Sequence, residues 1–257
     1  MIAAPMLADF ATRLALGLAV ALLLTSSRVV PLSFFRTQAQ VILGLLVLAG
    51  LDQARAGGQP WEVWVLVTGA VAAYSSSVAW GLGLPKFGAA STALVFFVTA
   101  CWLLMSLPSR GSAVWAFNTA SRLSSGLLLG TTLTAMLLGH HYLTAPAMSI
   151  DPLKRIIGFL ALSLLVRCGL AAFGLGAARA GSMGWATTDG YSDAGTLLAA
   201  RWGMGFLGTA IATYMTWRTA QIRSTQSATG ILYITMIFVL FGELTAMILA
   251  GRSGALG

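Results

Sequence analysis

The chain has 257 residues, of which 58% are hydrophobic and only 9% are charged. A soluble domain carries about 25% charged residues, so these few charges cannot cover a water-soluble globule, and the composition predicts an integral membrane protein. The net charge is +8, but the basic residues are scattered singly, which argues against a nucleic-acid-binding surface.

Apolar stretches follow one another along the chain, each close to the roughly 20 residues that a helix needs to cross a bilayer. They predict an all-α, polytopic membrane bundle of about eight transmembrane helices, forming a single transmembrane domain over residues 1–257. The predicted spans are about 9–27, 33–53, 62–82, 87–106, 114–142, 154–178, 195–219 and 228–250.

The first span is predicted to be a retained helix rather than a signal peptide. Residues 1–9 have no positively charged start and no clear small-residue cleavage site. Arg13 falls within this span and is expected to lie at the membrane interface.

Proline separates the first six predicted spans, because it breaks helix interiors but is tolerated at their ends. The prolines between spans are Pro31, Pro60, Pro85, Pro108, Pro146 and Pro152. The last two connectors are polar instead, at residues 187–193 and 224–227, and Asp193 is expected to cap the helix that follows.

The fifth span carries polar residues near both ends. Arg122 follows Asn118 by one turn, and His140 lies eighteen residues further on, which is five turns and the same helix face. The face between them is mainly apolar, so the pattern predicts two separate polar sites. His140 and His141 are either interface anchors or hydrogen-bond partners of a quinone. A third possibility is that one of them, His140 or His141, is a single haem ligand. The two cannot both bind one iron axially, because adjacent residues point about 100° apart on a helix.

Three further charges lie inside apolar spans. Arg167 is at the middle of the sixth span, on a stripe of small residues that favours contact with other helices. Arg201 and Glu243 are expected at similar depth in the last two spans, which are antiparallel neighbours. The sequence therefore predicts an Arg201–Glu243 ion pair.

The predicted interior has more positive than negative charge. If Arg122, Arg167 and Arg201 are all buried, they stand against Glu243, and such an excess needs compensation in an apolar medium. The alternative for Arg122 is a place at the outer membrane interface, because the apolar part of its span begins near Leu127. This predicts an anionic or quinone-like ligand between the fifth, sixth and seventh spans with Arg167 at its centre. A structural lipid phosphate, haem propionates, a small carboxylate or a partner's acid would each serve.

The connecting loops predict the orientation through the excess of Lys and Arg on the cytoplasmic side. One side carries seven basic residues: Arg28, Arg36, Lys86, Lys154, Arg155, Arg218 and Arg223. The other side carries four: Arg55, Arg110, Arg179 and Arg252. Both termini are therefore predicted outside the cytoplasm, in a membrane of the bacterial inner type.

The sequence contains no Walker A, GxSxG or HExxH motif. Short loops and unbalanced buried charge favour an integral membrane subunit of a larger, energy-converting complex that handles electrons or quinone. Such a subunit has an Arg/His-lined site for a quinone, haem propionate or lipid, and docks to other membrane subunits or to a second copy. The alternative is a transporter or channel for a small anion or metabolite. The sequence leaves open whether the protein is an enzyme.

Overall fold

The computed structural model describes residues 5–107, 113–144, 148–179 and 191–253, and every regular element in these ranges is a helix. Arg110, Pro108, Pro146 and the loop containing Asp189, all used in the sequence predictions, lie outside the described residues. The helices are α1 (Met6–Leu24), α2 (Leu32–Arg55), α3 (Pro60–Gly81), α4 (Pro85–Met105), α5 (Ala113–Thr144), α6 (Asp151–Arg179), α7 (Tyr191–Ala200), η2 (Arg201–Gly208), α8 (Thr209–Gln221) and α9 (Thr225–Ser253).

The described helices form an apolar bundle that fits a membrane. Seven of them are long and apolar enough to cross one: α1 to α6 and α9. Large apolar side chains cover the outside of the bundle, with Leu82 and Leu165 at 70% and 71% exposed. This surface suits lipid, and the predicted all-α membrane bundle is confirmed.

The remaining predicted span, 195–219, corresponds to α7, η2 and α8 in succession. Backbone angles at Ala200, Gly208 and Thr209 are all helical, so the three elements form one unbroken run. The middle section, Arg201–Gly208, is a π-helix, which the sequence did not predict. It contains Gly205, where an added Cβ would lie 2.7 Å from the Cα of Gly242, so η2 and α9 pack backbone against backbone.

Proline and polar residues define helix starts as the sequence indicated. Pro60 and Pro85 occupy the first turns of α3 and α4. At the start of α3, the Gln59 amide and the Glu62 side chain also form a capping box. The helix α1 begins at Met6, three residues earlier than predicted, so Asp9 belongs to its first turn and is buried.

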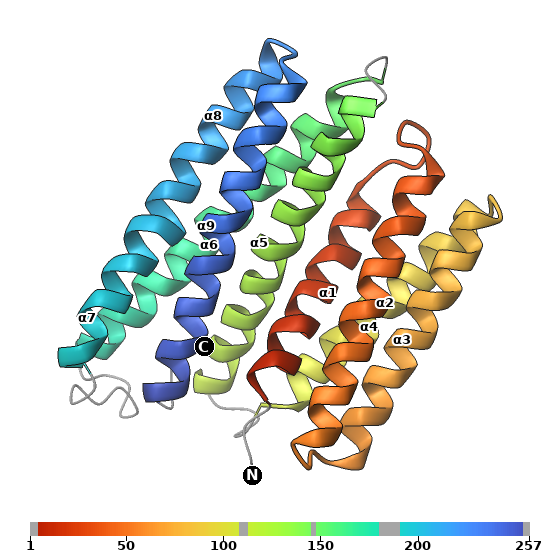
Figure 1. The fold of residues 1–257 in the computed structure, drawn as a ribbon. Helices are drawn as coiled ribbons and strands as arrows, with labels where there is room; N and C mark the ends of the chain where they lie inside the picture. Colours follow the sequence, from red (N-terminus) through yellow and green to blue (C-terminus); the bar gives the residue numbers. More distant parts are fainter. Residues whose placement is uncertain (1–4, 108–112, 145–147, 180–190, 254–257) are drawn as a thin grey trace.

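Helix α5 is central in the bundle (Figure 1). It packs against α1 on one side and against α6 and α9 on the other, while α2, α3 and α4 lie beyond α1. The start of α1 and the end of α9 lie at the same end of the bundle, which agrees with an even number of crossings.

Helices α1 and α5 approach so closely that only glycine fits at the crossing. A Cβ on Gly17 would overlap the carbonyl oxygen of Gly126, and a Cβ on Gly130 would overlap the backbone of Gly17. Gly126 and Gly130 form a small-xxx-small pair, the spacing that lets membrane helices pack backbone to backbone. This crossing fixes how α1 and α5 sit against each other, and thus which polar side chains meet beside it.

Candidate functional site

Arg167 of α6 and Glu243 of α9 form a buried, bidentate ion pair against α5. Arg167 Nε donates to Glu243 Oε1 and Arg167 Nη2 donates to Oε2, both at 2.9 Å. The side chains are only 1% and 4% exposed. Two parallel N–H···O bonds of this kind are the strongest geometry available to arginine and carboxylate.

Serines of α5 complete this pair. Ser125 Oγ donates to Glu243 Oε2 at 2.6 Å, and Arg167 Nη1 donates to Ser121 Oγ, also at 2.6 Å. Ser121 and Ser125 are four residues apart and so lie on one face of α5. Every guanidinium nitrogen of Arg167 has a partner, so the cluster is internally satisfied.

The predicted partner of Glu243 was wrong, because the ion pair is with Arg167 and not with Arg201. Helices α6 and α9 both pack on α5, and the long Arg167 side chain reaches from one to the other. Arg201 lies within electrostatic range of Glu243, and its guanidinium lies 5.7 Å from the centre of the Phe206 ring. Glu243 supplies the counter-charge of Arg167, so the prediction that Arg167 requires an external anion is wrong.

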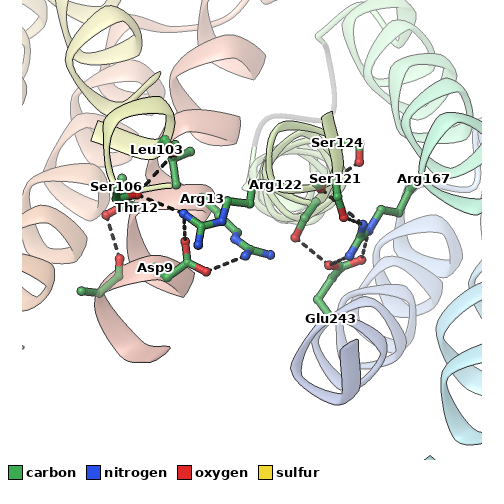
Figure 2. A network of polar contacts seen from close by, with 12 residues as sticks. Asp9, Thr12, Arg13, Leu103, Ser106, Ser121, Arg122, Ser124, Arg167 and Glu243 are labelled. Carbon is green, nitrogen blue, oxygen red and sulfur yellow. Dashed lines mark hydrogen bonds and ion pairs between the residues drawn. The ribbon is translucent and has the colours of Figure 1, made fainter. Parts of the chain in front are cut away.

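A second charged cluster lies on the opposite side of α5, between α1 and α5 (Figure 2). Asp9 Oδ2 accepts a hydrogen bond from Arg13 Nη2 at 2.5 Å, and Asp9 Oδ1 lies 3.5 Å from Arg122 Nη1. Arg122 Nη1 also donates to Ser106 Oγ at 3.0 Å. Figure 2 shows the carboxylate between the two guanidinium groups.

The two clusters are separate because Ser121 and Arg122 are consecutive residues on α5. Consecutive side chains point about 100° apart on a helix, so Ser121 faces Arg167 while Arg122 faces Asp9. Asn118 lies one turn before Arg122, and its Oδ1 is buried with no hydrogen-bond partner in the described structure.

The second cluster contains two features that were not predicted from the sequence. Arg13 is 2% exposed, so its side chain is buried between helices. Asp9 is a buried acid in addition to Glu243, and the sequence analysis missed it. The signal was present in the spacing of Asp9 and Arg13, four residues apart, which places opposite charges on one helix face.

His140 and His141 lie at the far end of α5 from Arg122 and line a cavity of about 180 Å³ beside the start of α2. The other lining residues are Ser33, Phe34, Thr37, Gln38 and Leu137. The His141 ring is tilted against Phe34, with ring centres 6.1 Å apart.

Gln38 was also missed from the sequence. Its side chain is 1% exposed, and neither Nε2 nor Oε1 has a hydrogen-bond partner within the described ranges. A buried amide without partners costs about 1–3 kcal/mol for each unpaired group. Gln38 also lines the cavity, and the two polar atoms of its amide are themselves buried.

The described part of the chain contains no group of three or more His, Cys, Asp or Glu side chains that could hold a metal ion.

Comparison with known proteins gives no relative: no family model, curated protein or solved structure matches this chain.

Proposed function

We propose that the protein is a quinone-binding membrane subunit of a larger, energy-converting complex, with the quinone head group in the cavity between α2 and α5. The observation that carries this proposal is that Gln38, His140 and His141 line one cavity, and that the buried Gln38 amide has an unpaired donor and an unpaired acceptor that a ligand entering the cavity would satisfy. The volume of about 180 Å³ suits one substituted ring, and an isoprenoid tail would lie in the lipid.

The lining suits both redox forms of a quinone. A quinone presents two carbonyl acceptors and its quinol presents two hydroxyl donors, while amide and imidazole groups donate and accept. Phe34 adds an aromatic surface for the ring. Conversion between the forms moves two electrons and two protons, so the proposal implies a partner subunit that carries a redox centre.

The transport alternative is less well supported. It routes a small anion past Arg167, Arg201 and Glu243, but Arg167 and Glu243 are buried and bonded to each other and to serines. Partners in the proposal are membrane lipids and other membrane subunits or a second copy, and not nucleic acid.

Quinone binding should depend on Gln38. In Gln38→Leu, loss of two amide hydrogen bonds of about 1 kcal/mol each should weaken binding of decyl-ubiquinone by about thirtyfold. Titration of purified protein in detergent, followed by calorimetry, measures the change. The matched control is Gln40→Leu, two residues along α2, where the side chain is exposed. Equal affinity in both variants, or no binding by the wild type, would contradict the proposal.

We further propose that both termini lie outside the cytoplasm, in a membrane of the bacterial inner type, because the loops on the other side carry more Lys and Arg. In a background where Cys101 and Cys168 are replaced by serine, Gln226→Cys should react with an impermeant thiol reagent from the cytoplasmic side only. Ala56→Cys should react from the opposite side only. If both cysteines react from the same side, the predicted topology is excluded. If Gln226→Cys reacts only from outside and Ala56→Cys only from the cytoplasm, the helices cross as predicted but the orientation is opposite.

A further inference from the structure

The charges around Asp9 do not balance. Arg13 and Arg122 both approach the carboxylate of Asp9, so these three side chains together carry a net charge of +1. The side chains of Arg13 and Asp9 are 2% and 8% exposed. An excess charge in such a place is costly unless a counter-charge accompanies it.

The hydrogen bonds do not balance either. Arg13 Nη2 donates to Asp9, but Arg13 Nε and Nη1 are buried and have no partner in the structure described here. A guanidinium has five N–H donors and no acceptor, so only an additional acceptor can fill these positions. Arg167, on the other side of α5, shows the contrast, because each of its nitrogens is bonded.

The helix crossing accounts for this arrangement. Gly17 lies one turn after Arg13, and Gly126 lies one turn after Arg122. The backbone contact between these glycines holds α1 and α5 together, so the two arginines beside it cannot move apart. The crossing therefore holds the two guanidinium groups beside Asp9. A second acid, Asp52 of α2, lies near this end of α1, but its carboxylate accepts a hydrogen bond from the backbone N–H of Ala8.

We infer that Arg13 and Arg122 bind a phosphate group at this end of the bundle. Arginine pairs bind phosphate oxygens through several N–H donors at once, and a phosphate monoanion would neutralise the excess charge. The cluster lies near the end of the bundle, since Asp9 is in the first turn of α1 and Ser106 directly follows α4. Arg122, at 16% side-chain exposure, is the accessible member, so the phosphate of a lipid head group or free phosphate would enter beside it.

The test uses the purified full-length protein, stripped of lipid in dodecyl maltoside and free of phosphate. Inorganic phosphate is added at constant ionic strength, and separately phosphatidylglycerol or phosphatidylcholine is added as mixed micelles. At tenfold excess over the dissociation constant, the unfolding temperature of the wild type should rise by about 3–6 °C. A rise with inorganic phosphate identifies the free anion, and a rise with phosphatidylglycerol alone identifies a lipid head group.

The decisive variant is Arg122→Gln, which keeps the Asp9–Arg13 pair but removes the excess charge. It should remain as stable as the wild type without phosphate and should lose the stabilisation by the effective ligand. The matched control is Arg55→Gln, an exposed arginine at the same end of the bundle, which should respond like the wild type. The inference is overturned if no probe stabilises the wild type, or if Arg122→Gln responds as strongly as Arg55→Gln.

If Arg122→Gln fails to fold, Arg122→Lys replaces it. This variant should bind the same probe at least tenfold more weakly than the wild type, and unchanged affinity would overturn the inference.

Discussion

Replacing Glu243 with glutamine should lower the free energy of unfolding by about 3–5 kcal/mol, the usual result of removing one partner of a buried ion pair. The glutamine amide can still accept one hydrogen bond from Arg167, but the guanidinium charge is left without a counter-charge. Ser125 Oγ, which donates to Glu243 Oε2 at 2.6 Å, also loses its ionised acceptor. Reversible unfolding by sodium dodecyl sulfate in mixed micelles measures the change.

The double variant Arg167→Met, Glu243→Leu tests whether the loss comes from the unpaired charge. Because both charges are removed together, this variant should recover most of the stability lost in Glu243→Gln. Arg155→Leu removes an exposed arginine near the start of α6 and should change stability by less than about 0.5 kcal/mol. Additive losses in the double variant would show that Arg167 and Glu243 act independently, contrary to the bidentate pair in the structure.

Replacing Gly130 with alanine should destabilise the protein by about 3 kcal/mol, at the upper end of the usual cost of overpacking. The added methyl group would overlap the backbone of Gly17 and Leu18. Backbone atoms in two packed helices cannot move aside as a flexible side chain can, so α1 and α5 must separate. The same unfolding titration measures this effect.

Gly158→Ala is the matched control for this change. Gly158 is also a helical glycine, on α6, but an added Cβ would have no atom within 4 Å. Since alanine favours a helix more than glycine does, the control should be neutral or slightly stabilising. Equal stability of Gly130→Ala and Gly158→Ala would mean that the α1–α5 crossing is looser than the structure shows.

The sequence by itself determined the helical membrane architecture. The length of an apolar run and the position of a proline are local properties, so α3 and α4 could be placed to within about two residues from Pro60 and Pro85 alone. The separation of Arg122 from His140 was equally readable, because five helical turns place them at opposite ends of α5 whatever surrounds it. The π-helical section at Arg201–Gly208 was not readable, since glycines in an apolar run do not reveal a change of hydrogen-bond register.

The charge pairing was decided only by the tertiary structure. Arg201 was predicted as the ion-pair partner of Glu243 because the two residues lie at similar depth in the membrane on consecutive helices. Several residues share that depth, so depth alone does not select the partner. The choice of Arg167 depends on α5, whose serines hold the carboxylate and whose packing brings α6 and α9 within reach of one side chain. In the same way, helix periodicity did not reveal that Arg13 and Arg122 share the Asp9 carboxylate, because that contact depends on the glycine crossing of α1 and α5. Periodicity gives the face that a side chain occupies, whereas the identity of its partner depends on which helices pack together and how closely their backbones approach.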